Sequence, residues 1–577
     1  MLPLAARARA VRPALLMFCL LPLLWACPQG GREGSSPETS TRTELPWLVG
    51  TAEASHDPVA TLCVGGGATF CGRQVDPSVE GAIADPLLTK ATAITGANGE
   101  TLILATTTNI GYFLAYKTEQ GGANGIYDIR LRVAEATGVP SANVIVVSDH
   151  SHNGPDTIGL WGGVEEDYLR ITADAVVGAS VAAFDNRKPA RLKVAAVNDN
   201  ANPVPGVPPL ESSYAVPPAY DLSRGGPSNQ FRLLVAEDAA GQRLLTMVNY
   251  APHATVWNGV ATDRLTGDWA AWAPQIAERR YGGMGLAAVG SVGATDWNKF
   301  GDVNERKAEA FQRLETLMDA ADAVLQPVRG DQLQVQTTFI REPILQPVLL
   351  LNYKPRLPTN QPGLPSEHFD VRIDRSVLPP FLLGSVFGTY ISAVRIGDIF
   401  LSTFPGEPFG ELEYVLRGEE RVAGAQAWFL LGAANDFFGY MVHDFETYQQ
   451  TLEGAAWLLG CPEREILEPL GVENRSCADH WTLMVSPTIG QHIVCTLQNA
   501  AASMGFATQH AEGSCSMLTA LDGLAPPEEL PAAVQRDPEA LAAASLQQSA
   551  DLPRLCRERG ALPALCSALE AALAQRE

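Results

Sequence analysis

Six short apolar runs place the strongest constraint on how this chain folds. A strand with one solvated face alternates apolar and polar residues, whereas a strand buried on both faces does not. Because the runs are nearly continuous, they are predicted to be strands in the interior of a layered protein. They occupy residues 101–106, 143–148, 244–250, 285–291, 399–404 and 427–433.

Helical patterns lie between these runs. Strands that alternate with helices predict an α/β protein in which helices cover a central sheet, either mixed or mostly parallel. The chain has 577 residues, of which 46% are hydrophobic, and this is enough for one large core with an appendage. The predicted helices cover residues 127–138, 167–184, 269–280 and 304–325.

Polar residues, several of them able to bind a metal, follow five of the six runs. In open α/β sheets, ligands bind beyond the carboxyl ends of the strands. The sequence therefore predicts a catalytic site at these strand ends. The residues are Asp149, His150, Ser151 and His152; His253; the segment 292–298; Glu407; and Asn435, Asp436 and Tyr440.

Two of the nine histidines, His150 and His152, stand one residue apart after the run 143–148. In an extended segment, residues i and i+2 point to the same side. Both imidazoles can therefore face one cavity, where one binds a metal and the other contacts what the metal holds.

Each candidate also has a structural alternative when it is taken alone. The two histidines can be satisfied by local hydrogen bonds, and a carboxylate at the start of a helix is favoured by the helix dipole. The alternatives are local hydrogen bonding for His150 and His152, a turn for His253, a helix N-terminus for Glu407, the core for Tyr440 and an N-cap for Asp268.

Residues 1–27 are predicted to be a lipoprotein-type signal peptide. Basic residues precede an apolar segment that is too short to span a membrane comfortably. Ala26 stands directly before Cys27, as in a bacterial lipobox whose cysteine is lipidated; an ordinary signal peptide cleaved nearby is the alternative. Residues 28–45 are polar and read as a flexible tether. We expect an exported protein that is anchored by lipid at the membrane of a bacterial cell envelope, or secreted if the lipobox is not used.

The remaining cysteines suit an oxidising compartment. Apart from Cys19 and Cys27 there are eight, in locally spaced pairs, and none has the CxxC spacing of a cysteine zinc site. Up to four disulfides are expected, although spacing alone leaves their connectivity open. Nearest neighbours would pair Cys63 with Cys71, Cys461 with Cys477, Cys495 with Cys515 and Cys556 with Cys566. The formal net charge of −23 repels phosphate backbones, so no nucleic-acid partner is expected.

Five short motifs, in this order, resemble those of the neutral/alkaline, non-lysosomal ceramidase family, and the resemblance spans residues 45–510. It places a ceramidase-like catalytic domain at residues 46–524. The motifs are HSHNGP (150–155), NYAPHATVWN (249–258), TGDW (266–269), FPGEPFGELEYVLR (404–417) and NDFFGYMVHDFETYQQTLEGAAWLLG (435–460).

The resemblance implies one catalytic zinc ion held by two histidines, a glutamate and a tyrosine, here His150, His253, Glu407 and Tyr440. Neutral imidazoles and a carboxylate suit zinc. Zinc lowers the pKa of bound water to about 7 and so supplies hydroxide for hydrolysis of an amide. His152 would then stabilise the negative charge that develops on the substrate carbonyl. Asp268 and Ser291 match further catalytic positions of the family.

The chain also departs from the family pattern. The segment 197–206 replaces Asn-Arg-Ser-Pro, so an arginine for the substrate is missing there, and Leu452 replaces a substrate-side tyrosine. Residues 461–485 form an insertion that contains cysteines. Residues 525–577, which are rich in Ala and Leu and predicted to be helical, stand in place of the family's C-terminal β-sandwich.

Three functions stay open. The first is a zinc-dependent amidohydrolase that cleaves an N-acyl lipid, as a ceramidase does. The second is a zinc hydrolase for other amides or esters on the same scaffold. The third is a non-catalytic surface lipoprotein that binds a ligand or partner. The complete ligand set argues against the third, and the departures leave the first two open.

Overall fold

The computed structural model describes the greater part of residues 45–508 and nothing outside that span. Cys27, residues 28–44 of the tether, the insertion 461–485 and the region 525–577 therefore lie outside the described residues, as does Leu452. The described ranges are 45–66, 71–118, 121–212, 228–297, 301–343, 369–370, 386–410, 412–413, 422–441 and 489–508.

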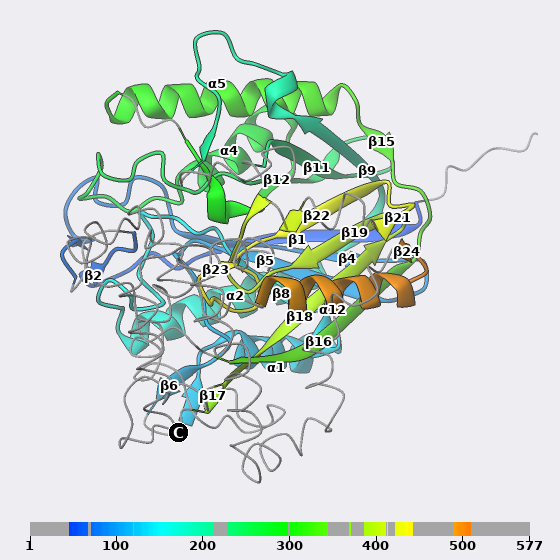
Figure 1. Ribbon diagram of the computed structural model, residues 1–577, viewed down its shortest axis with the longest axis horizontal. Helices are drawn as coiled ribbons and strands as arrows, with labels where there is room; N and C mark the ends of the chain where they lie inside the picture. The colour runs from blue at the N-terminus through cyan, green and yellow to red at the C-terminus, as the bar shows by residue number, and fades with distance from the viewer. Residues whose placement is uncertain are drawn as a thin grey trace, which may run out of the picture. The chain divides into compact units, whose positions relative to one another are not determined.

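The larger sheet is mixed and runs in the order β13-β12-β11-β9-β1-β4-β5-β8, with β15 also paired to β9 (Figure 1). Most neighbouring strands are antiparallel. Parallel pairing occurs at the two ends of this order, between β12 and β13 and between β5 and β8. The strands are β1 (Trp47–Ser55), β4 (Leu88–Thr95), β5 (Thr101–Thr107), β8 (Val144–Ser148), β9 (Lys188–Asn198), β11 (Gln230–Glu237), β12 (Arg243–Tyr250), β13 (Met284–Val289) and β15 (Gln326–Pro327).

A second sheet has the order β16-β18-β19-β22, with β17 paired to β18. Its strands are β16 (Leu333–Pro343), β17 (Phe369–Asp370), β18 (Val386–Ile396), β19 (Ile399–Thr403) and β22 (Ala427–Leu431), and β19 and β22 are parallel. Several two-stranded ladders complete the described strands. They are β2 (Leu62–Cys63) with β3 (Gln74–Val75), β6 (Tyr116–Thr118) with β7 (Gly121–Ala123), β10 (Glu211–Ser212) with β14 (Thr295–Asp296), β20 (Glu407–Pro408) with β23 (Tyr440–Met441), and β21 (Val422–Ala423) with β24 (Ala507–Thr508).

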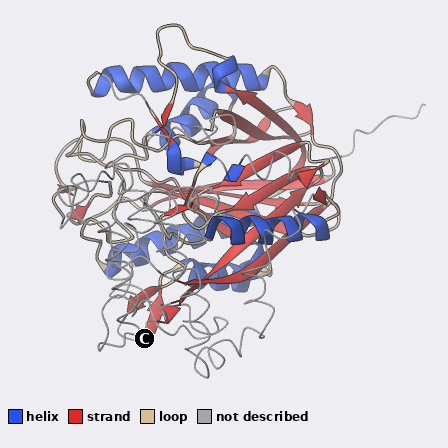
Figure 2. Cartoon of the chain, in the orientation of Figure 1, coloured by secondary structure: helices blue, strands red, loops and turns tan. Residues whose placement is uncertain are grey.

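The two sheets pack face to face, and helices cover their outer faces (Figure 2). Val147 and Met247 of the larger sheet share a buried apolar cluster with Leu401 and Phe429 of the second. Full burial of each such side chain contributes about 1.5–3 kcal/mol. The helices α1 (Ile126–Thr137), α2 (Glu166–Asp185), α4 (Trp269–Tyr281) and α5 (Val303–Asp322) lie on the larger sheet, and α12 (Ile489–Ser503) lies on the second.

The α/β fold with a mixed central sheet is confirmed, and each apolar run is a strand: β5, β8, β12, β13, β19 and β22. The alternative of a mostly parallel sheet is wrong for this chain, since most pairs of the larger sheet are antiparallel. Helices on one face and a second sheet on the other bury both faces of the strands. Continuous apolar runs then arise whatever the direction of pairing.

Each of the four helices predicted between the apolar runs is present within three residues of its expected ends. Capping explains where two of them begin. Asp268 is the N-cap of α4, and Asp302 forms a capping box with Glu305 at the start of α5. Among the helices of the described ranges, none combines the length and the apolar character that crossing a membrane requires.

Candidate metal centre

The carboxyl ends of three parallel strand pairs meet at one place. The backbone N–H of Ser148, at the end of β8, donates to the carbonyl of Ala433, 2.9 Å away. The N–H of Gly432, after β22, donates to the carbonyl of Val289 at the end of β13, also at 2.9 Å. These bonds tie the loops of the second sheet to those of the larger sheet, as the strand-end argument requires.

Three histidine rings gather at this junction. The centroid of the His150 ring lies 5.0 Å from that of His152 and 5.2 Å from that of His253. Each ring offers one nitrogen within 4.8 Å of the nitrogens of the other two, so the cluster can hold a metal ion. His150 and His253 are buried, at 1% and 3% exposure. The structure thus brings together the three histidines that the sequence singled out.

Backbone carbonyls fix the orientation of the two buried rings. Nδ1 of His150 donates to the carbonyl of Ile110 at 2.6 Å, and Nδ1 of His253 donates to that of Thr295 at 3.2 Å. A carbonyl can only accept, so Nδ1 bears the hydrogen in both rings. The Nε2 atoms therefore carry the lone pairs and are the atoms that could bind a metal, in the arrangement that metal-binding histidines adopt.

The carboxylate of Glu407 lies between these two Nε2 atoms. Its Oε2 is 3.2 Å from Nε2 of His150 and 3.0 Å from Nε2 of His253. With neutral imidazoles, three lone pairs would converge on one buried point, and a cation satisfies all three. This donor set, two imidazole nitrogens and a carboxylate oxygen, fits a divalent ion of the zinc type.

Electrostatics keep Glu407 ionised. Burial alone would raise the pKa of this carboxyl, but the charge and the Nε2–H groups that His150 and His253 carry when protonated outweigh burial and hold the pKa well below its usual range. Burial lowers the pKa of His253, yet the hydrogen bond and charge of Glu407 raise it further, so the net shift is upward. The pocket therefore favours positive charge beside a fixed carboxylate.

Tyr440 is placed next to Glu407 by the ladder of β20 and β23. The two residues are register partners in parallel strands, and the N–H of Glu407 donates to the carbonyl of Gly439 at 2.8 Å. Side chains of directly paired residues point to the same side. Tyr440 is buried, and its ring packs edge-on against Phe409.

His152 reaches the cluster by a different route from the one expected. Its Nε2 lies 3.3 Å from Nε2 of His150. The segment is not extended, because His150 has a left-handed backbone with φ of 56°. The chain turns after β8, and a bridge between Ser151 and Ala254 then realigns it beside the His253 loop. The premise of an extended His-x-His segment is wrong, although the two rings do meet.

Phe437 packs on the outer face of His150. The two rings stack with centroids 5.3 Å apart and planes inclined by 22°. Asp436 holds this aromatic in place by accepting from the N–H groups of Phe437 at 2.9 Å and Leu114 at 3.0 Å. Burial raises the pKa of Asp436 to about 7. The sequence had flagged Asp436 only as a polar residue after a strand.

A disulfide-closed hairpin packs on His152. The predicted disulfide between Cys63 and Cys71 is present and closes the turn after β2. Gly66 lies so close to His152 that a Cβ added to it would be 2.1 Å from Nδ1 of the ring. Arg73 donates to the carbonyl of His152 at 3.1 Å. Cys495 also forms a disulfide, and Cys515, its predicted partner, lies outside the described residues.

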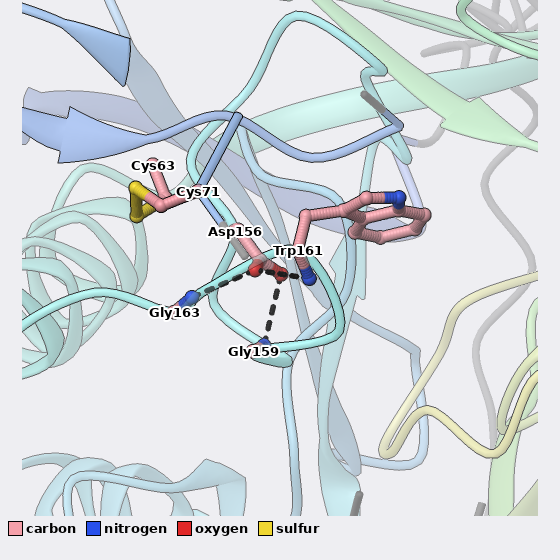
Figure 3. Close-up of a disulfide and its surroundings, with 6 residues drawn as sticks. All are labelled: Cys63, Cys71, Asp156, Gly159, Trp161 and Gly163. Atoms are coloured by element: carbon pink, nitrogen blue, oxygen red, sulfur yellow. Dashed lines mark hydrogen bonds between the residues drawn. A yellow bond between two sulfur atoms is a disulfide. The ribbon is translucent and has the colours of Figure 1, made fainter. Parts of the chain in front are cut away.

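The same hairpin adjoins the loop that carries Trp161 (Figure 3). The carboxylate of Asp156 accepts from the N–H groups of Gly159, Trp161 and Gly163, each at 2.8 Å. The indole of Trp161 lies with its centroid 6.3 Å from that of His152. Sequence reasoning missed both Gly66 and Trp161. A glycine triplet between two cysteines and a tryptophan followed by two glycines were the available signals.

Asp268 supports the loop that carries His253. Its carboxylate accepts from the N–H groups of Val256, Trp257 and Trp269, at 3.2, 2.9 and 2.7 Å. Burial raises its pKa to about 7. The two loop residues follow His253 closely, so the carboxylate joins the His253 loop to the start of α4. These contacts give Asp268 a positioning role, alongside the N-cap that the sequence also suggested.

Ser291 lies in a separate buried network. Its hydroxyl donates to Glu413 at 2.7 Å, and Glu413 also accepts from Ser228 and Arg232. The turn that follows Ser291 packs against the backbone of Glu407, because a Cβ on Gly293 would lie 2.5 Å from the carbonyl oxygen of Glu407. The side-chain contact of Ser291 is thus with Glu413, and it is Gly293, two residues further on, that lies against Glu407.

The fold and the cluster together define a helix–sheet–sheet–helix protein with a buried histidine and glutamate site at its strand ends. Two solved structures share this fold. The neutral ceramidase from Pseudomonas aeruginosa superimposes with a TM-score of 0.55 at 17% identity, over 81% of this chain and 76% of that one. A ceramidase complexed with C2 gives a TM-score of 0.54 at 15% identity, over 82% and 78%. The chain thus has a ceramidase-like fold.

Comparisons of sequence add nothing to this likeness. No protein-family model matches the chain, and no curated protein matches it.

Proposed function

We propose that this protein is a zinc-dependent hydrolase that cleaves the amide bond of an N-acyl lipid. One observation carries the proposal: Nε2 of His150 and Nε2 of His253 both face Oε2 of Glu407, while their Nδ1 atoms are held by backbone carbonyls. The ceramidase-like fold supports the choice of reaction. Tyr440 is proposed as the fourth ligand because it is the register partner of Glu407.

A zinc ion bound at these residues supplies Lewis acidity and a hydroxide nucleophile at neutral pH. Glu407 stays ionised, because its pKa is held far below neutrality, so it acts as a ligand and not as a proton donor. His152 lies at the edge of the cluster and is less buried than the other two histidines. From there its Nε2–H can donate to the oxygen of a substrate carbonyl as negative charge develops on it.

The second candidate is a zinc hydrolase for other amides or esters on the same scaffold. It is favoured by the departures at 197–206, where the expected arginine is absent and Asp199 instead pairs with Tyr250 and Arg313. A turnover panel distinguishes the two candidates. It should include N-acyl sphingosines, N-acyl amino acids and simple esters, with metal-loaded protein and a chelated control. Hydrolysis of esters alone would exclude the amidase, and absence of all turnover would favour a binding lipoprotein.

The proposal places the enzyme outside the cytoplasm, anchored through Cys27. The disulfide between Cys63 and Cys71 supports an oxidising compartment. Metabolic labelling with a fatty acid should mark the wild-type chain and not a Cys27→Ser variant. Equal labelling of that variant would refute the anchor and leave the hydrolase proposal untouched.

A further inference from the structure

Trp161 stands beside the metal centre without belonging to it. Its indole and the ring of His152 have centroids 6.3 Å apart and planes inclined by 55°. The side chain is partly exposed and packs on the core of the larger sheet. A large apolar surface that remains open next to a reaction centre is a candidate contact for substrate.

The backbone of Trp161 is fixed on both sides of its Cα. Its N–H donates to Asp156 at 2.8 Å, and its carbonyl accepts from the N–H of Cys71 at 2.5 Å. The following residue, Gly162, has φ of 135°, and a Cβ there would lie 2.9 Å from the sulfur of Cys63. In Figure 3 the indole projects away from the Asp156 turn and from the disulfide. The loop therefore presents a preorganised aromatic surface, which reduces the entropy cost of binding.

The chemistry of this surface is apolar. Residues 157–163, Thr-Ile-Gly-Leu-Trp-Gly-Gly, contain no charged side chain. The one carboxylate of the loop, that of Asp156, accepts three backbone N–H groups. The loop thus offers the indole face to a ligand, and it offers no charged partner to a polar head group.

We propose that Trp161 determines specificity by receiving the apolar group that the scissile carbonyl bears, the first part of the acyl chain. This inference rests on the proposed function, because His152 locates the carbonyl. An acyl group bound to the cluster through its carbonyl would run along the neighbouring indole. Acyl chains that cover the ring would then be preferred over acetyl.

Alkyl hydroxamates test the proposal, since their metal-binding group is constant and only the chain varies. Affinities of acetohydroxamate and octanohydroxamate are measured by titration calorimetry on the zinc-loaded protein. We expect octanohydroxamate to bind the wild type about tenfold or more tightly, from burial of methylenes. Trp161→Ala should remove most of that difference and leave acetohydroxamate unchanged, and Trp161→Phe should retain part of it.

Trp47→Phe is the matched control. Trp47 is at the start of β1, where it pairs with Ala190 and its neighbour Leu48 pairs with Thr95. It therefore lies at the opposite end of the strands from the site. It should leave both affinities unchanged. An unchanged chain-length preference in Trp161→Ala would overturn the inference, as would an equal loss of both ligands, which indicates a structural role.

If the proposed function is wrong, the hydroxamate titrations give a result that differs from a failure of the Trp161 inference. If acetohydroxamate does not bind the zinc-loaded wild type, the metal centre is wrong. Octanoate quenching of tryptophan fluorescence in metal-free protein then decides the inference about Trp161. Quenching that Trp161→Phe abolishes supports an apolar contact there, and quenching that persists in this variant contradicts it.

Discussion

Glu407 and Tyr440 are direct partners in a two-residue parallel ladder, although each follows a different strand of the second sheet. The ladder sets the two side chains on one side, and Oε2 of Glu407 meets the histidines that follow strands of the larger sheet. On the proposed ligand set, the second sheet would contribute the anionic and phenolic groups, and the larger sheet would contribute the imidazoles.

Removal of His253 should release the metal. Without its Nε2, the proposed ligand set is reduced to His150, Glu407 and Tyr440, and a site with one ligand fewer binds much more weakly. Elemental analysis of chelator-free protein should give about one zinc per wild-type chain and far less in His253→Ala. His56→Gln is the matched control, because His56 is also a buried histidine but bonds to Tyr168 and Thr107. Stoichiometric zinc in His253→Ala would remove this residue from the ligand set.

His152 and His150 should differ in what their loss does. His152→Ala is expected to retain zinc and lose turnover by about 100- to 1000-fold, the usual cost of one oxyanion donor. His150→Ala should lose both zinc and turnover. If His152→Ala loses its zinc as well, the three histidines form the ligand set and His152 is not the oxyanion donor.

Gly66→Ala should impair turnover through His152 alone. The added Cβ would lie 2.1 Å from Nδ1 of His152, so the ring has to move. Gly81→Ala separates this clash from backbone strain, because Gly81 also has a positive φ and has nothing within 4 Å. Both variants should lose about 1 kcal/mol of stability in urea unfolding. Only Gly66→Ala should lose turnover, with zinc content unchanged; equal turnover in the two variants would contradict the contact.

Asp268→Ala should weaken metal binding as well as stability. The N-cap of α4 is lost, at a cost of about 1 kcal/mol, and the loop after His253 loses two hydrogen bonds. Asp302→Ala removes the N-cap of α5 and serves as the control. Zinc affinity, measured by competition with a chelator, should fall in Asp268→Ala only. Normal affinity and stability with lost turnover would instead place Asp268 in the chemistry.

Because of His56, the free energy of unfolding should decrease in mild acid. Burial lowers its pKa to about 4, whereas an unfolded chain has the ordinary value of about 6.5. The unfolded state therefore binds the proton more readily, and stability falls as the pH decreases from 6.5 towards 4. At pH 5 the loss is about 2 kcal/mol relative to pH 7.5. Urea unfolding should show this loss in the wild type and its absence in His56→Gln; parallel pH profiles would contradict it.

The sequence was sufficient for six of the buried strands and for the residues that follow five of them, whereas strands such as β1, β4, β9 and β11 were not predicted. The apolar runs at β5, β8, β12, β13, β19 and β22 are visible because both faces of these strands are buried. Pairing direction was not accessible, since the apolar strand β5 pairs antiparallel with β4 on one side and parallel with β8 on the other. Direction depends on connections and on partners that lie far apart in the sequence.

The surroundings of the site were harder to predict. Gly66 and Trp161 approach His152 through contacts such as the bridge between Val64 and Pro155, which depend on the tertiary fold. The left-handed backbone of His150 was also hidden, because most residues other than glycine avoid that conformation. The predicted ligands His150, His253 and Glu407 do lie together, because polar residues at the ends of neighbouring strands share one edge.

The bonds that join the two sheets at the cluster have a consequence for the order of folding. His253 and Glu407 are separated by 154 residues, and they come from different sheets. Contacts of this range close a long loop, and the entropy cost of that closure is incurred before the contact returns any stability. On the proposed function, a bound ion would therefore stabilise strand ends that the rest of the fold has already brought together. Metal content would then report the fraction of molecules that have completed folding, and chelation would loosen the strand ends at the cluster while the apolar contacts between the sheets persist.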